Sequence, residues 1–321
     1  MTFGLFLVLL LAFSLASDSF FTRNNLISMS REAAFTGIIA VGATFVIITG
    51  GIDLSVGSAM AVSAMVCSNI LRFTSHSIPV AILAALATGL ACGLFNGVVI
   101  TRLKLPDFIV VLASMGIFRG ITKLMAATDL ASMGKNAMIA NRTFKLLAGR
   151  VHWFYYVVIA FVVVAVVGQF VLRRTRLGLY TYAVGSNLQS STLSGIKAAN
   201  IKIFVYALTG FLCGVSGVFT AARLMTATTE TGMGMEFNVI AAVVIGGASL
   251  TGGRGDVIGT FIGTLMMAII NSGTVQIGIP TFYQPVIKGG IILAAVFFDM
   301  WYVSRTGRPA APALAMAEKT A

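Results

Sequence analysis

The chain consists of long apolar runs separated by short polar stretches, and a helix needs about 20 apolar residues to cross a bilayer. This requirement predicts ten apolar segments: 1–16, 34–50, 54–71, 78–101, 108–126, 153–172, 203–222, 238–252, 257–273 and 284–303. The second and third segments are short and joined by a glycine-rich turn, as are the eighth and ninth, so each pair forms two spans or one broken, re-entrant span. The pattern predicts an all-α, polytopic transmembrane helix bundle of about 8–10 spans.

The first apolar run has two interpretations. Its short apolar core ends in Ala16 and Ser17, which is typical of a cleaved signal peptide. No Lys or Arg precedes that core, which favours a membrane helix. We expect a first membrane helix that lacks a few residues at this start site, and the signal peptide stays as the alternative.

The composition also indicates a polytopic membrane protein. Hydrophobic residues make up 58% and charged residues 10% of the 321 positions, and the mean hydropathy is +0.96. Soluble domains carry about 25% charged residues, so this chain cannot cover a normal water-facing surface. The net charge of +12 fits basic loops that meet anionic membrane lipid, and we expect no nucleic-acid binding. The three cysteines and two histidines lack the spacing of a metal site.

A dense basic cluster sets the expected orientation. Arg173, Arg174 and Arg176 directly follow an apolar segment, and such clusters stay in the cytoplasm. This places both termini inside. We expect one transmembrane domain over 1–303 and a disordered cytoplasmic tail over 304–321.

Close helix packing is indicated by glycines four residues apart. They are Gly89, Gly93 and Gly97; Gly210 and Gly214; and Gly255, Gly259 and Gly263. Small residues at this spacing let membrane helices approach closely, so we assign them to packing.

The turn between the second and third segments carries an acid. Asp53 lies in the sequence TGGIDLSVGS at 49–58, and a carboxylate near membrane depth usually faces protein or a water-filled cavity. Residues 50–57 also align with 246–253 as Gly-Gly-x-x-Leu-(Ser/Thr)-x-Gly. Transporters often repeat a broken segment at the binding site, although eight positions can coincide by chance in a glycine-rich chain.

These stretches resemble a known family. The run AVGATFVI at 40–47, followed by GGIDLSVGS, is similar to the membrane permease subunit of ribose-type carbohydrate ABC importers, within the branched-chain amino acid and sugar permease superfamily. The stretches 108–120, 175–196 and 237–260 extend the likeness over nearly the whole chain. The resemblance implies a pore in the bacterial inner membrane that passes a monosaccharide or polyol to the cytoplasm. It also implies a periplasmic sugar-binding protein, a cytoplasmic ABC ATPase and a second permease copy or homologue as partners.

The polar stretch 173–202 matches the family's coupling segment, which docks on the ATPase. A short amphipathic helix that ends at Gly195 is expected there. The coupling residues carried over are Asn187, Leu188, Gln189, Ser190, Leu193, Ser194 and Gly195. The family usually has Asn-Glu-Ala-Ala at 187–190, so Leu188 replaces an acid and puts a charged contact with the partner in doubt. An ordinary solvated loop is the alternative.

The chain contains no phosphate-binding loop of the G-x-x-x-x-G-K-[S/T] type. The partner ATPase must therefore bind ATP and Mg²⁺, and we expect no cofactor and no enzymatic activity in this chain. The histidines also lie far in sequence from any plausible nucleophile.

An uncharged sugar needs hydroxyl-matching donors and acceptors along its route. The predicted pathway residues are Thr44, Asp53, Ser55, Asn96, Ser114, Arg119, Asn271 and Gln284. Hydrogen bonds between helices are the alternative role for the Ser, Thr and Asn side chains. Asp53 can instead cap the broken helix, and Arg119 can either reach the membrane interface or find a partner within the bundle.

Two other functions stay open from the residues alone. One is an energy-independent channel or ion-coupled secondary transporter that uses Asp53 as a proton or ion site. The other is a receptor or scaffold that recruits a partner through its inner loop.

Overall fold

The computed structural model describes residues 2–73, 77–133, 139 and 141–305. Helices make up most of this part of the chain. They are α1 Thr2–Ala16, α2 Arg23–Ile48, α3 Val56–Phe73, α4 Ile78–Arg102, α5 Asp107–Met133, α6 Arg142–Lys145, α7 Tyr156–Arg174, α8 Arg176–Ser186, α9 Leu188–Leu193, α10 Ala198–Leu224, α11 Met235–Ile245, α12 Val257–Gln276 and α13 Gln284–Arg305, with 3₁₀ turns at Leu146–Ala148 and Thr281–Tyr283. Two short strands, β1 Arg150–Val151 and β2 Phe154–Tyr155, form an antiparallel hairpin in which Arg150 lies opposite Tyr155.

Each of the ten predicted apolar segments overlaps a helix, which confirms the all-α bundle. The eighth, 238–252, is helical only to Ile245, where α11 ends in the glycine-rich turn. Six helices of the described chain are long and apolar enough to cross a membrane, and α1, α3 and α11 are shorter apolar helices. The chain is a multi-pass membrane protein. The predicted tail is helical up to Arg305, and the rest of it lies outside the described residues.

Several predicted boundaries are wrong because helices continue through polar residues, most of all at the start of α2 and the end of α5. The second segment was expected from residue 34, but α2 begins at Arg23. Its polar first half is held by side-chain contacts, among them Arg31 over the Tyr155 ring at 4.6 Å. At the other boundary, α5 continues to Met133 into a stretch expected to be a loop.

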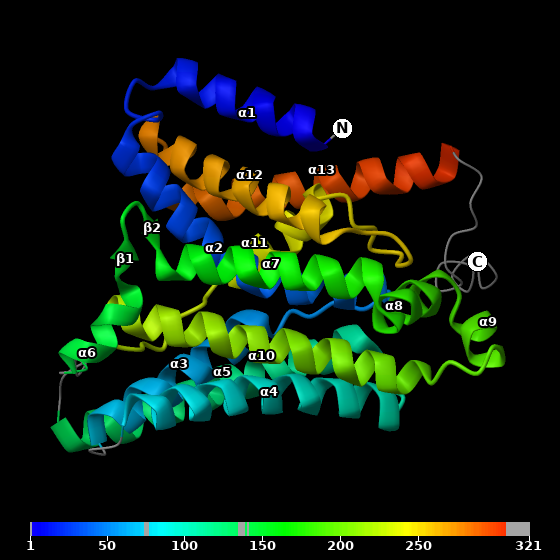
Figure 1. The fold of residues 1–321 in the computed structure, drawn as a ribbon, viewed down its shortest axis with the longest axis horizontal. Helices are drawn as coiled ribbons and strands as arrows, with labels where there is room; N and C mark the ends of the chain where they lie inside the picture. The colour runs from blue at the N-terminus through cyan, green and yellow to red at the C-terminus, as the bar shows by residue number, and fades with distance from the viewer. Residues whose placement is uncertain (1, 74–76, 134–138, 140, 306–321) are drawn as a thin grey trace.

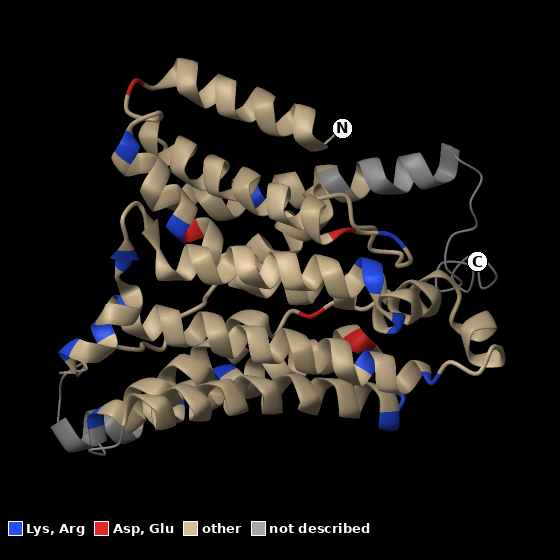
Figure 2. Cartoon of the chain, in the orientation of Figure 1, with Lys and Arg blue, Asp and Glu red and all other residues tan. Residues whose placement is uncertain are grey.

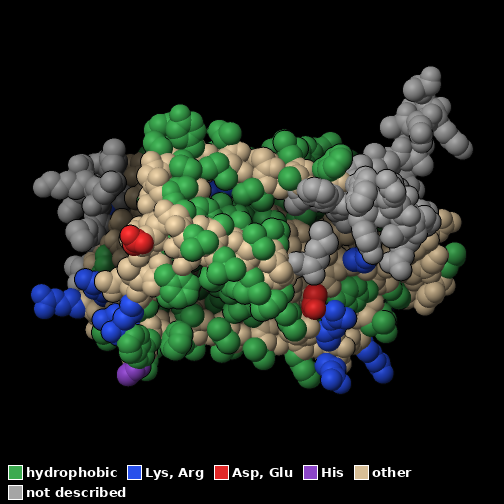
Figure 3. Space-filling model, turned by 90° about the horizontal axis from the view of Figure 1, so that it is seen from above, with side chains coloured by type: hydrophobic (Ala, Val, Ile, Leu, Met, Phe, Trp, Pro, Cys, Tyr) green, Lys and Arg blue, Asp and Glu red, His purple; other side chains and the backbone are tan. Residues whose placement is uncertain are grey.

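The long helices run roughly along one direction, so the molecule has two ends (Figure 1). Helices α8 and α9 lie at one of them, which we call the α9 end, and the strands β1 and β2 mark the opposite, hairpin end. The start of α1 and the end of α13 both point toward the α9 end. Lys and Arg residues gather near the two ends (Figure 2), and hydrophobic side chains cover most of the face between them that Figure 3 shows. This distribution is the one that a lipid-embedded bundle requires.

Helix α2 is the centre of the bundle. Every residue from Ala33 to Ile48 is buried, and helices α10, α12, α7 and α11 pack around it. A helix that is apolar all round is stable only when it is enclosed in this way.

Glycines bring the other helices close together. A Cβ atom added at Gly93 of α4 would clash with the backbone carbonyl of Tyr206 in α10, and one at Gly259 would clash with the carbonyl of Gly246. The predicted packing role of these glycines is confirmed. Gly116 and Gly120 of α5 differ, because a Cβ atom at either position would have no atom within 4 Å.

Candidate functional site

The two glycine-rich turns of the predicted repeat end their helices in the same way. At the end of α2, Gly51 N donates to Val46 O (3.0 Å) and Gly50 N to Ile47 O (2.9 Å). At the end of α11, Ala248 N donates to Val243 O (3.2 Å) and Gly247 N to Val244 O (2.9 Å). This pair of bonds defines a Schellman motif, which needs a left-handed residue that glycine supplies. Gly50 (φ 78°) and Gly247 (φ 95°) fill that position.

The structural equivalence corrects the sequence alignment by one residue. Sequence matching pairs Gly50 with Gly246, whereas the helix ends pair Gly50 with Gly247. The two turns also touch each other, since Gly253 N donates to Ile48 O (2.8 Å). A Cβ atom at Gly185 of α8 would clash with the same Ile48 carbonyl. The two copies of the motif therefore meet beneath α8.

Asp53 belongs to a buried polar cluster with two other predicted residues. Its Oδ1 accepts hydrogen bonds from Ser55 N (2.8 Å) and Ser55 Oγ (2.6 Å). Asn96 Nδ2 of α4 donates to Ser55 Oγ (2.8 Å). Asp53 is only 6% exposed, and no ion pair joins it to a cation within the described ranges. All three are predicted pathway residues, and the fold brings their side chains into contact where α3 begins.

Replacing Ser55 by alanine is expected to destabilise the protein by about 1–3 kcal/mol, because it removes a donor from the Asp53 carboxylate and the acceptor of Asn96 Nδ2. Thermal unfolding of the purified protein measures this change. Ser58→Ala is the matched control, since the equally buried Ser58 hydroxyl donates only to the carbonyl of Ser55. Equal losses from the two variants would contradict the cluster's importance.

A second polar network holds the 49–55 turn from the side of α10. Lys202 Nζ forms an ion pair with the Asp107 carboxylate at the start of α5 (2.9 Å to Oδ2). One turn further along α10, the hydroxyl of the fully buried Tyr206 lies 3.1 Å from Ile52 O and 3.3 Å from Asp107 Oδ2. Gly51 makes room for this network, because a Cβ atom there would lie 2.8 Å from the Tyr206 hydroxyl.

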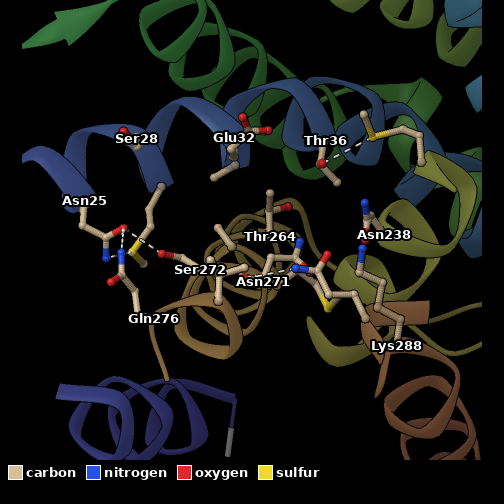
Figure 4. Close-up of a pocket in the computed structure, with 17 residues that line it drawn as sticks. Asn25, Ser28, Glu32, Thr36, Asn238, Thr264, Asn271, Ser272, Gln276 and Lys288 are labelled. Atoms are coloured by element: carbon tan, nitrogen blue, oxygen red, sulfur yellow. Dashed lines mark hydrogen bonds between the residues drawn. The ribbon is translucent and has the colours of Figure 1, made fainter. Parts of the chain in front are cut away.

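A cavity of about 430 Å³ opens among α2, α11, α12 and α13 (Figure 4). Amide, hydroxyl and charged side chains line it, together with Met, Val and Ala residues. The polar lining residues are Asn25, Ser28, Glu32, Thr36, Asn238, Thr264, Asn271, Ser272, Gln276, Gln284 and Lys288. Of the predicted pathway residues, the cavity contains Asn271 and Gln284, whose Nε2 lies 3.5 Å from Asn271 O.

Sequence reasoning missed most of this lining, although one signal could have revealed it. Asn25, Ser28, Glu32 and Thr36 recur at three- or four-residue intervals and line the cavity from one side of α2. Residues at this spacing share a helix face, so polar residues that recur in this way along a membrane helix indicate a polar surface inside the protein.

The remaining predicted residues lie apart from this cavity. Thr44 Oγ1 shares a hydrogen bond with Thr260 Oγ1 (2.7 Å), which joins α2 to α12, and Ser114 Oγ donates to Val110 O of its own helix. Arg119 Nη1 donates to the carbonyls of Thr229 (3.0 Å) and Thr231 (2.7 Å), so its partner does lie within the bundle. The eight predicted residues are thus distributed over several separate sites.

The predicted coupling segment forms a short helix at the α9 end. Asn187 caps α9 by accepting a hydrogen bond from Ser190 N (2.8 Å), and Gly195 follows the helix with φ 82°. Ser191 is buried, whereas Leu188 is 54% and Leu193 83% exposed. The helix therefore presents two leucines to its surroundings. Gln189 and Ser194 are also exposed.

Helix α8 ties this end to the second glycine-rich turn. The Tyr182 hydroxyl donates to Gly255 O (2.7 Å), and burial raises the pKa of Tyr182 above its ordinary value. Arg173 Nη2 pairs with Asp256 Oδ2 (3.1 Å) beside it.

The sequence is similar to known transport permeases over most of its length. Residues 25–296 match the family described as branched-chain amino acid transport system / permease component. The ribose import permease protein of Escherichia coli (strain K12) is 38% identical over 91% of each chain, and that of Bacillus subtilis (strain 168) is 38% identical over 92% of this chain and 90% of its own. The L-arabinose ABC transporter permease protein of Azospirillum brasilense is 37% identical over 92% of this chain and 86% of its own. No solved structure matches the chain.

The family match covers far more than half of the sequence, and the relatives align along almost their entire lengths. The chain therefore belongs to the branched-chain amino acid transport system / permease component family.

Proposed function

We propose that this chain is the translocation subunit of an ATP-driven importer for a monosaccharide or related polyol. The observation that carries the proposal is the 38% identity to ribose import permeases over about nine-tenths of both chains. Relatives named for arabinose, xylose and allose transport support the same substrate class. The hydrolysis of ATP, with its Mg²⁺, belongs to a separate ATPase subunit.

We infer the orientation from the dense arginine cluster. Arg173, Arg174 and Arg176 lie where α7 meets α8, so the α9 end faces the cytoplasm of the bacterial inner membrane. The ATPase then docks on α9, and the sugar-binding protein delivers its cargo at the hairpin end. A second copy of the chain, or a homologous permease, completes the pore.

Reconstitution tests the proposal. Proteoliposomes that contain only this chain are expected to show no ATP-driven uptake of labelled D-ribose, L-arabinose, D-xylose or D-allose. Adding the ATPase and the binding protein is expected to start uptake of at least one of these sugars. Transport by this chain alone under a proton gradient, lost in Asp53→Asn, would instead support an ion-coupled secondary transporter.

A further inference from the structure

The cavity near the hairpin end contains two buried acceptor atoms that lack donors. Asn238 Oδ1 of α11 and Asn271 Oδ1 of α12 are inaccessible to solvent and accept no hydrogen bond from any described residue. Both residues line the cavity. Buried polar atoms are almost always paired, so two unpaired acceptors beside one cavity indicate that a donor enters it.

The other lining groups restrict the chemistry of that donor. Figure 4 shows Lys288 beside Asn238, and its ammonium group can donate to an oxygen of a ligand. The two unpaired carbonyl oxygens need a donor, which a carboxylate anion cannot supply. Glu32 forms an ion pair with Arg223 and is 54% exposed, so its charge is already compensated. A neutral molecule that both donates and accepts hydrogen bonds satisfies these groups best.

The size and the apolar part of the lining agree with a small cyclic polyol. The volume of about 430 Å³ lies within the usual range of small-molecule pockets, about 300–1,000 Å³. Met29, Met235, Met267 and Val275 supply apolar contacts. Such side chains can pack against the C–H faces of a sugar ring while the amides bind its hydroxyls.

We propose that this cavity is a sugar-binding site in the hairpin-end half of the permease, where the side-chain amides of Asn238 and Asn271 turn toward the cavity and bind two sugar hydroxyls. The inference rests on the proposed function, because it names the place within the chain where the transported sugar binds.

A cysteine-protection experiment tests it on the purified chain in lipid nanodiscs. Ser272 lines the cavity, and the three native cysteines are buried, so Ser272→Cys provides a thiol that reports on the cavity. Its rate of reaction with a small methanethiosulfonate reagent is measured with D-ribose, L-arabinose, D-xylose or D-allose present. At least one of these sugars is expected to slow the reaction about tenfold at saturation. Ribose 5-phosphate is expected to have no such effect.

Two further variants assign the protection to the amides. Adding Asn238→Leu or Asn271→Leu to the Ser272→Cys reporter is expected to abolish the protection by sugar. Gln169→Leu is the matched control, since Gln169 Oε1 of α7 is also buried and unpaired but lies outside the cavity lining. This variant is expected to keep full protection.

Three results would overturn the inference. The first is a reporter thiol that no sugar protects, although the reconstituted importer transports that sugar. The second is protection that survives both leucine substitutions, and the third is a thiol that reacts only with lipid-soluble reagents, which would indicate a lipid-filled cavity. Because the assay needs neither ATP nor partners, these failures are separate from a failure of the reconstituted uptake.

Discussion

Gly93→Leu is expected to leave little folded protein. In the structure, α4 and α10 touch through their backbones, and a side chain at Gly93 would collide with the carbonyl of Tyr206 and the Cα atom of Ala207. Overpacking a core usually costs about 1–3 kcal/mol when side chains can move aside. Here the obstacle is a helix backbone, so we expect a loss at or above the upper limit of that range.

The yield of monodisperse protein and its melting temperature in detergent measure this effect. Gly116→Leu is the matched control, because it makes the same change within a long apolar helix where a Cβ atom has no neighbour within 4 Å. We expect this control to unfold at nearly the wild-type temperature. Wild-type stability of Gly93→Leu would show that the α4–α10 contact is looser than the structure indicates.

Leu193→Asp is expected to abolish ATP-driven uptake without unfolding the chain. Leu193 is 83% exposed at the end of α9, so a charge there disturbs few contacts within the chain. In the proposed importer this leucine enters the ATPase interface. Truncating a hot-spot residue of an interface costs about 2 kcal/mol or more, and a buried charge adds to that cost. The affinity for the ATPase is therefore expected to fall more than about tenfold.

Co-purification with the ATPase and sugar uptake in proteoliposomes provide the two measurements. Leu103→Asp is the comparison variant, since Leu103 is 65% exposed and follows α4 in a connection outside the coupling segment. We expect the complex to tolerate Leu103→Asp. If Leu193→Asp binds the ATPase normally, α9 is not the docking helix.

The sequence predicts the helices well because apolar runs of membrane length have few alternatives. All ten predicted segments overlap a helix, although the eighth, 238–252, is helical only to Ile245. The break at 49–55 lies where Gly50 and Asp53 predict it. The boundaries are less certain wherever a helix carries polar residues, as at Arg23. There, tertiary contacts such as the stacking of Arg23 on Trp153 compensate for low hydropathy, and these contacts cannot be read from local sequence.

The candidate site is only partly predictable for a related reason. Asp53, Ser55 and Asn96 were each predicted to line the pathway on polarity alone. Their mutual contact depends on how α3 packs against α4. Asn271 and Gln284 were expected in the same way, whereas Asn238 and Asn25 were missed. A cavity is formed by several helices together, and no single stretch of sequence contains that information.

The tyrosine on α10 has a consequence for the acid-bearing turn. A phenol carries one proton, so the Tyr206 hydroxyl cannot donate to Ile52 O and Asp107 Oδ2 at the same time. Lys202 pairs with both carboxylate oxygens of Asp107 and so weakens them as acceptors, and Ile52 O is the nearer acceptor (3.1 Å against 3.3 Å), so we expect the phenolic proton to lie on the Ile52 carbonyl. Lys202 of α10, the helix that follows the coupling segment, thus acts indirectly on the hydrogen bond between Tyr206 and the 49–55 turn. Loss of its ammonium group would turn the proton toward the carboxylate and free the backbone beside Asp53.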